Sequence, residues 1–116
     1  MASYRIKKIE SLIKEELSLV FLHKLRDPKL GLVTVTGVKL SPDLKIAKVY
    51  LSVFERENRE EILNKVNEIN SMIRTLLAKK VYLNRVPELK FFIDDTQDYV
   101  EKMDDLFKKI KDDNEG

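Results

Sequence analysis

The 116-residue chain contains no cysteine and no tryptophan, and it has only three glycines, three prolines and one histidine. The absence of cysteine excludes a disulfide framework, a thiolate metal site and a cysteine nucleophile. Glycine occurs only at positions 31, 37 and 116, so the chain cannot form a glycine-rich phosphate-binding loop. These absences remove the residues that several common classes of enzyme require.

Long apolar segments are also missing. The longest uninterrupted apolar run is Leu19 to Leu22, whereas a membrane-spanning helix needs roughly 20 residues. Charged residues at positions 7, 8, 10 and 14 interrupt the first apolar segment, so it does not resemble a secretory signal. We therefore expect a cytoplasmic protein that does not bind a membrane.

The remaining candidates for chemistry have simpler explanations. His23 is the sole imidazole, and its position near the end of a predicted helix suits the helix dipole. Asp94, Asp95 and Asp98 lack the central glycine and distal glutamate of a calcium loop, and they lie where a helix start favours acidic residues. We expect no catalytic residue, no metal and no cofactor, and hence a protein that is not an enzyme.

Charge is unevenly distributed along the chain. Residues 1–90 carry 18 basic and 11 acidic side chains, whereas residues 91–116 carry 4 basic and 9 acidic ones. A basic body followed by an acidic segment is typical of a protein that binds a polyanion. An uneven but functionally neutral surface is the alternative.

The length fits one domain, and the apolar periodicity alternates between helix and strand spacing. The expected elements are a helix over residues 3–25, strands over 32–40 and 44–54, a helix or broken helix over 58–80, a strand over 88–93, and a helix over 97–110 before a frayed end over 112–116.

Local signals mark the ends of these elements. Ser3 is placed to cap the first helix, and Arg26-Asp27-Pro28 is expected to end it. Ser41-Pro42-Asp43 predicts the turn of an antiparallel hairpin, and Gly37 a bulge or bend in its first strand. Asn58 followed by Glu61 resembles a capping box.

Basic side chains are the best candidates for binding, because lysine and arginine contact phosphates without reading sequence. On the second helix, Ser71 and Arg74 lie on a face of short side chains that a flat partner can approach closely. A solvated face without function is the alternative. The candidates for phosphate contact are Arg74, Lys79, Lys80 and Arg85, with Ser71 for close approach and Lys45, Lys48, Lys7 and Lys14 as flanking contacts.

Several short motifs, in order and spacing, resemble the ribosome-binding factor A family of bacterial 30S-assembly factors. The matching segments are Leu25-Arg26-Asp27-Pro28, Val33-Thr34-Val35-Thr36, Ser41-Pro42-Asp43-Leu44, Ala47-Lys48-Val49-Tyr50-Leu51-Ser52, Ile73-Arg74-Thr75-Leu76-Leu77, Arg85-Val86-Pro87-Glu88-Leu89 and Phe91-Phe92-Ile93-Asp94. Together they cover about residues 4–110.

The resemblance implies an α+β, type II KH-like fold with the order αββααβ, helices on one face of a three-stranded sheet, and a C-terminal helical extension. It implies a KH-like RNA-binding domain over residues 1–95 and an acidic helix with a frayed tail over 96–116. It also implies binding to the immature 30S subunit through 16S rRNA, late 30S maturation, pre-16S rRNA processing, growth in the cold and work alongside assembly GTPases. We expect a monomer.

An ordinary KH domain grips nucleic acid with a GXXG loop, which this chain lacks. The family is similar in lacking it, and breaks the helix at an Ala-x-Gly element instead. That element aligns with Ile69-Asn70-Ser71, where both small residues are replaced. Asn70 and Ser71 still permit an irregular turn, but Ile69 also fits the core stripe of one continuous helix.

Two other functions stay open. The first is a generic KH-like module for single-stranded RNA, against which stand the missing GXXG loop and a scarcity of exposed aromatic side chains. The second is a protein-interaction adaptor that uses the acidic tail or the C-terminal helix.

Overall fold

The protein is an α+β fold, seen in a computed structural model that describes residues 2–23, 32–81, 83 and 85–115, with the backbone alone at 2, 3, 97 and 111–115. Its elements are α1 (Ala2–His23), β1 (Val33–Leu40), β2 (Ile46–Val53), the 3-10 turn η1 (Arg56–Asn58), α2 (Arg59–Glu68), α3 (Asn70–Lys80), β3 (Glu88–Ile93) and α4 (Thr96–Glu115). The predicted order αββααβ with a C-terminal helix is confirmed. The expected stop signal Arg26-Asp27-Pro28 lies outside the described residues.

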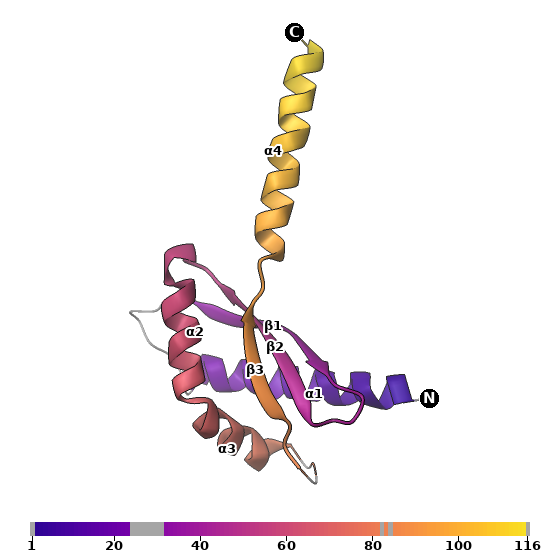
Figure 1. Cartoon of the computed structure of the whole chain (residues 1–116), viewed down its shortest axis with the longest axis vertical. Coiled ribbons are helices and arrows are strands. Elements are labelled where there is room, and N and C mark those ends of the chain that lie inside the picture. The colour runs from indigo at the N-terminus through magenta and orange to yellow at the C-terminus, as the bar shows by residue number, and fades with distance from the viewer. Residues whose placement is uncertain (1, 24–31, 82, 84, 116) are drawn as a thin grey trace.

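One sheet has the strand order β1-β2-β3, with β1 antiparallel to β2 and β2 parallel to β3. A parallel pair needs a crossover, and α2 and α3 supply it. Helices α1, α2 and α3 cover one face, and α1 crosses behind the sheet in Figure 1. The uncovered face, which we call the open face, is therefore turned toward the viewer. Strand alternation places on it Thr34, Lys39, Ile46, Lys48, Tyr50, Ser52, Glu88, Lys90 and Phe92.

The β1–β2 hairpin has the predicted turn and the predicted irregularity. The pairing register shifts between Val35 and Gly37, so a bulge lies there. In the turn, the Leu44 N–H donates to the Ser41 carbonyl at 2.9 Å, and Leu44 adopts a left-handed φ of 62°. That conformation is uncommon for a branched side chain, and the hydrogen bonds around the turn hold it.

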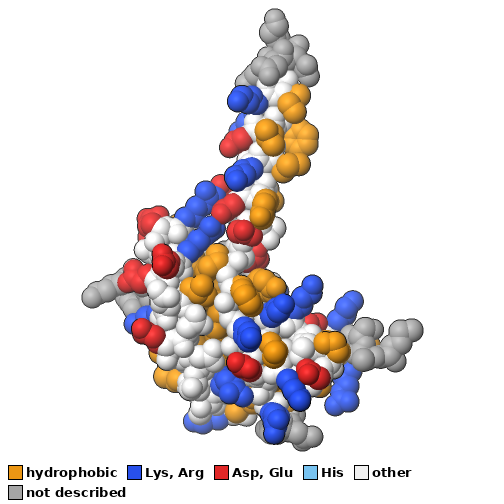
Figure 2. Space-filling view, viewed as in Figure 1, with side chains coloured by type: hydrophobic (Ala, Val, Ile, Leu, Met, Phe, Trp, Pro, Cys, Tyr) orange, Lys and Arg blue, Asp and Glu red, His pale blue; other side chains and the backbone are white. Residues whose placement is uncertain are grey.

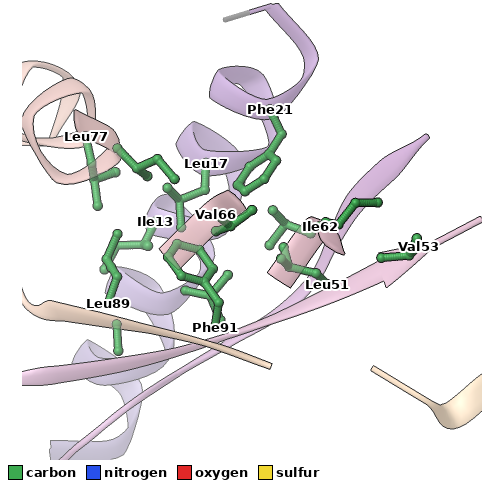
Figure 3. Close-up of a cluster of buried hydrophobic side chains, with 14 of the residues drawn as sticks. Ile13, Leu17, Phe21, Leu51, Val53, Ile62, Val66, Leu77, Leu89 and Phe91 are labelled. Carbon is green, nitrogen blue, oxygen red and sulfur yellow. The ribbon is translucent and has the colours of Figure 1, made fainter. Parts of the chain in front are cut away.

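The core lies between the sheet and its three helices. Ile13, Leu17, Leu51, Ile73 and Leu77 have no exposed side-chain surface, and each comes from a predicted apolar stripe or strand. Figure 3 shows these apolar side chains converging from α1, α2, α3 and the strands. Each fully buried aliphatic side chain contributes roughly 1.5–3 kcal/mol through burial, so this cluster is the main source of stability.

Phe21 of α1 and Phe91 of β3 join the helix layer to the sheet. Their rings meet edge to face, with centroids 6.3 Å apart and an angle of 67° between the planes. This is the arrangement that the charge distribution of aromatic rings favours. It is one direct contact between α1 and β3.

The long second helix is broken at Ile69, which ends α2 and precedes α3. Ile69 has φ −101° and ψ 17°, and its N–H still donates to the Lys65 carbonyl at 3.2 Å. Next to it, Asn70 Nδ2 donates to the Leu89 carbonyl of β3 at 2.9 Å. Of the two alternatives that the sequence left open, a broken helix and a continuous one, the structure shows the broken helix.

Three local predictions were wrong. The first helix begins at Ala2, so Ser3 lies inside it and not at the N-cap position. The Asn58 side chain makes no cap hydrogen bond and donates to Glu55 Oε2 at 3.1 Å, because η1 replaces the capping box. The last helix does not end near Ile110 but continues to Glu115, since no proline or glycine interrupts it before position 116.

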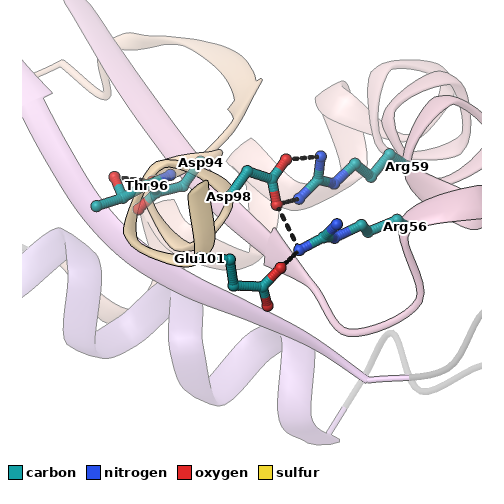
Figure 4. A network of polar contacts seen from close by, with 6 residues as sticks. All are labelled: Arg56, Arg59, Asp94, Thr96, Asp98 and Glu101. Atoms are coloured by element: carbon teal, nitrogen blue, oxygen red, sulfur yellow. Dashed lines mark hydrogen bonds and ion pairs between the residues drawn. The ribbon is translucent and has the colours of Figure 1, made fainter. Parts of the chain in front are cut away.

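Helix α4 projects from the body and is joined to it by an ion-pair network at its first turns (Figures 1 and 4). Arg59 donates to both carboxylate oxygens of Asp98, at 2.7 and 3.0 Å, and Arg56 pairs with Asp98 at 3.1 Å and with Glu101. The hydrogen bonds from Arg59 hold the pKa of Asp98 below its ordinary value. One side of α4 leaves apolar side chains exposed, namely Tyr99, Val100, Met103, Leu106, Phe107 and Ile110.

Candidate nucleic-acid interface

The helix break opens onto a groove, which we call the α3–β3 groove. Its lining comes from the start of α3, the segment before β3, the first residues of β3 and the approach to β2: Asn70, Ser71, Arg74, Arg85, Val86, Glu88, Leu89 and Lys45. Four of the predicted RNA contacts, Ser71, Arg74, Arg85 and Lys45, are thus brought together. Glu88 is the acidic residue among them.

Arg74 is held in the wall of the groove and does not extend freely into solvent. It is half-buried, and its Nη2 donates to the Val86 carbonyl at 2.9 Å. This bond ties α3 to the segment that leads into β3. The sequence placed Arg74 on an exposed helical face, and the structure shows that part of its donor capacity serves the fold.

Lys45 is positioned by the hairpin turn. Its N–H donates to Asp43 Oδ1 at 3.1 Å, and the Ser41 hydroxyl donates to the same oxygen at 2.6 Å. The hydrogen bond from Ser41 and then that from the Lys45 backbone lower the pKa of Asp43, so Asp43 is charged at neutral pH. The Lys45 side chain itself is exposed.

A second hollow adjoins the groove, because Lys45 and Arg85 line both. Its other lining residues are Arg5, Ile9, Leu40, Asp43, Leu44, Leu83 and Pro87. Arg5 comes from the start of α1 and was missed by the sequence analysis, which followed the lysines of that helix. Together the two hollows form one basic tract that includes Arg5, Lys45, Arg74 and Arg85. Two acidic residues, Asp43 and Glu88, also line it.

The other predicted contacts lie elsewhere. Lys79 and Lys80 are exposed at the end of α3 and line neither hollow. Lys7 and Lys14 are exposed on α1, whose opposite side enters the core. Lys48 lies on the open face of the sheet. The nine predicted residues therefore occupy several surfaces, and only the α3–β3 groove gathers more than two of them.

The open face carries residues that the sequence analysis did not select. Lys39, Lys48 and Lys90 are paired in register across β1, β2 and β3 and form what we call the lysine row. In the next open-face position along the strands, the rings of Tyr50 and Phe92 stack with centroids 5.8 Å apart. Figure 2 shows basic and hydrophobic side chains next to each other over the sheet. Strand alternation in the sequence indicates on which face of its strand each lysine lies. It does not show that the three lysines align, because that depends on the pairing register of β1, β2 and β3.

The expected scarcity of exposed aromatic side chains was wrong. Phe92 is exposed because its strand position faces away from the helices, and Tyr99 and Phe107 because α4 projects from the body. Tyr4 near the start of α1 and Phe54 just after β2 are exposed as well.

Two of the three acidic candidates for a metal site have structural partners. Asp94 accepts hydrogen bonds from Thr36, at 2.6 Å, and from Thr96, while Asp98 is paired with Arg59. Within the residues that the structure describes, no group of His, Asp or Glu side chains is placed to hold a metal ion. In the same residues, no helix is both long and apolar enough to cross a membrane.

The order αββααβ, the parallel pairing of β2 with β3, and a helix break that faces β3 without a GXXG loop define the class of the protein as a KH-like domain. In such domains nucleic acid is held near the junction of the two helices. The α3–β3 groove lies at that junction.

The sequence model of the family described as "Ribosome-binding factor A" matches residues 5–107, and the chain belongs to this family. It is 39% identical to ribosome-binding factor A of Thermodesulfovibrio yellowstonii over 92% of this chain and 91% of that protein. The crystal structure of the Thermus thermophilus factor is similar, with a TM-score of 0.67 and 31% identity over 76% of this chain and 94% of that one. A homology model of the T. thermophilus factor, fitted into the cryo-EM map of a 30S complex, gives a TM-score of 0.68 at 31% identity and covers 76% of this chain and 93% of that one.

Proposed function

We propose that this protein binds the immature 30S subunit through 16S rRNA and assists late 30S maturation. In this proposal residues 1–95 are the RNA-binding unit, residues 96–116 are an extension, and the protein acts as a cytoplasmic monomer without catalysis of its own. The α3–β3 groove carries the proposal, because it brings basic side chains from three separate segments to a helix break. The similarity to a factor fitted into a 30S complex supports it.

The groove suits a folded RNA backbone better than a base-specific site. Arg85 and Lys45 are exposed and supply phosphate contacts, and Ser71 is short enough to let a phosphodiester chain approach α3. Arg74 adds its guanidinium N–H groups other than the buried Nε–H and the one that donates to the Val86 carbonyl. Asn70 is committed to the Leu89 carbonyl, so few free groups remain to read base edges. The groove would then recognise the RNA by its charge and shape.

The outlying lysines extend this contact. Lys79 and Lys80 continue the line of α3 beyond the groove, and Lys7 and Lys14 on α1 and Lys48 on the sheet form flanking contacts. Each is one phosphate contact among several, so single substitutions should have modest, salt-sensitive effects. Pre-16S rRNA processing, growth in the cold and cooperation with assembly GTPases belong to the same proposal as consequences of 30S binding.

Co-sedimentation of the purified protein with 30S, 50S and 70S particles, at low and moderate salt, tests the proposal. We expect selective binding to 30S, and at least a tenfold loss of affinity when Lys45→Glu and Arg85→Glu are combined. The matched control is Lys108→Glu with Lys109→Glu, two equal charge reversals at exposed positions of α4, which should retain binding. Arg74 is left unchanged because its bond to Val86 supports the fold.

Two results would contradict the proposal. The first is equal binding to all three particles that vanishes with salt, which would make the basic tract a nonspecific polyanion site. The second is undiminished 30S binding by the Lys45 and Arg85 double variant.

A second candidate function, a protein-interaction adaptor, is favoured by the exposed apolar side of α4. Met103, Leu106 and Phe107 are each more than half exposed on a helix that projects from the body beyond its first turns. Such a stripe is typical of a helix that docks in a partner's groove. An adaptor that worked through α4 would be unaffected by charge reversal at Lys45 and Arg85, so the same experiment discriminates between the two functions.

A further inference from the structure

We propose that the open face of the sheet is a second RNA-contact surface, which takes a short single-stranded segment with its bases on Tyr50 and Phe92 and its phosphates along the lysine row. This deepens the proposed function, since the segment would belong to the same rRNA. The surface is separate from the α3–β3 groove: Lys48 and Tyr50 face away from the layer of α1, α2 and α3.

The lysine row has no role in folding that the structure shows. Lys39, Lys48 and Lys90 are exposed, and none of them forms an ion pair within the described part of the chain. Adjacent strands lie about 4.8 Å apart, so the backbone positions that carry these three like-charged side chains are spaced at that interval across the sheet. Like charges directly opposite each other destabilise a sheet. A polyanion laid across the strands would neutralise this repulsion.

The ring pair supplies the second half of the surface. Tyr50 and Phe92 are stacked with an angle of 30° between their planes, and Phe92 is 40% exposed. Aromatic side chains exposed on a sheet give nucleobases a sequence-tolerant platform, because every base has a π face. The platform lies two residues along each strand from the lysine row, about 7 Å. A base on the rings therefore leaves its phosphate near the lysines.

Gly37 leaves the platform of Tyr50 and Phe92 accessible on the side of β1. It pairs with Tyr50, so the β1 residue directly opposite this ring has no side chain, and the neighbouring Thr36 in the bulge has its hydroxyl within hydrogen-bond distance of the Tyr50 carbonyl and of Asp94. A Cβ atom at this position would lie 3.9 Å from Tyr50 Cδ2. Any larger side chain would therefore lie against the tyrosine ring, whereas glycine leaves that side of the ring open.

Acidic residues limit the surface at both ends. Glu88 lies beside Ile46, one open-face position beyond the lysine row, and Asp94 lies past the aromatic row, where it accepts the Thr36 hydroxyl at 2.6 Å. Both carboxylates repel phosphate. The tract that attracts RNA is thus the middle of the sheet, which is long enough for a few nucleotides. Single strands fit this surface better than a duplex, whose bases are already stacked and paired.

The test is an NMR titration of the full-length protein with a ten-nucleotide oligouridine at low salt, with 30S co-sedimentation in parallel. We expect saturable shifts of backbone amides at Lys39, Lys48, Tyr50, Lys90 and Phe92. Combining Tyr50→Leu with Phe92→Leu should weaken oligouridine binding roughly 5- to 150-fold, the range for losing a stacked base. Phe107→Leu is the matched control, since Phe107 is 63% exposed and lies on α4, which projects from the body away from the sheet.

A charge variant keeps the test valid if the ring variant fails to fold. Lys48→Gln with Lys90→Gln should weaken binding and reduce its salt dependence, whereas Lys108→Gln with Lys109→Gln should not.

Shifts confined to the α3–β3 groove, with 30S binding intact, would overturn this inference and leave the proposed function standing. Open-face shifts that depend on protein concentration without RNA would assign the surface to a second copy of the chain and overturn it as well. Saturable open-face binding of oligouridine without any 30S binding would support the RNA surface and contradict the proposed function.

Discussion

The two faces of the sheet are made from the same strands but have opposite properties. Phe91 and Phe92 are neighbours in β3, yet Phe91 is 5% exposed against Phe21 and Phe92 is 40% exposed beside Tyr50. On β2, Val49 is fully buried and Lys48 is exposed. Alternation along a strand separates these roles at every residue.

The covered face determines the fold, because its apolar side chains are buried by three helices. The open face contributes little burial, so its residues are free to vary with function. Its lysine row adds charge repulsion, and its stacked ring pair contributes only the roughly 0.2–1 kcal/mol of a cross-strand contact while leaving apolar surface exposed. Substitutions on the covered face should therefore change mainly stability, and substitutions at the next residue along the strand, on the open face, should change mainly RNA binding.

The largest expected difference is between the two adjacent phenylalanines. Phe91→Ala should lower the free energy of unfolding by roughly 3–5 kcal/mol, because it leaves a cavity against Phe21. Phe92→Ala should lower it by less, roughly 1–2 kcal/mol, since the ring is already partly in water and loses mainly its stacking on Tyr50. Urea denaturation followed by circular dichroism measures both. Equal losses would mean that the open face is covered in solution.

A smaller effect is expected at Gly37, where stability and RNA binding should change in opposite directions. Gly37→Val should raise the free energy of unfolding by about 0.5–1 kcal/mol, because valine suits a strand and restricts the unfolded chain. Its side chain would cover the Tyr50 ring, so oligouridine binding should weaken. Thermal denaturation and the RNA titration on one sample give both values. A variant that gains stability and keeps full RNA affinity would remove Gly37 from the proposed surface.

The sequence predicted the fold well because each element has its own apolar period, as at Ile13 and Leu17 in α1 or Val49 and Leu51 in β2. The helix break could not be decided in the same way. Ile69 fits the apolar stripe of a continuous helix, and the break is accompanied by a hydrogen bond from Asn70 to Leu89, nineteen residues away. A contact over that distance is not visible in a local pattern.

The candidate site was predicted only in part for a similar reason. Charge and helical phase identified Ser71 and Arg74, but the bond from Arg74 to the Val86 carbonyl depends on how the segment before β3 packs. Lys48 was selected without Lys39 and Lys90, since their alignment requires both strand registers and the bulge after Val35. Arg5 was missed because its hollow forms only when α1 lies beside the hairpin turn.

The smallest expected effect concerns Asp94, at the acidic end of the open face. The Thr36 hydroxyl and then Thr96 hold the pKa of Asp94 below its ordinary value of 3.8. A lowered folded-state pKa contributes stability above the unfolded value, and that stability is lost as the pH falls through the folded value.

Thr36→Val keeps the branched shape and removes the hydroxyl, so the pKa of Asp94 should move back up toward 3.8. At pH 7 the variant should be less stable by about 0.5 kcal/mol, the lower end for a hydrogen bond, because both partners are partly in water. Below the folded pKa of Asp94 the carboxyl is protonated in both proteins, and most of the difference should disappear. Carbon-detected NMR titration of the Asp94 carboxyl from pH 6 to pH 2, with urea denaturation at both ends, measures the two quantities. An unchanged pKa would show that Thr96 alone stabilises the carboxylate, and that β1 does not fix the acidic end of the open face.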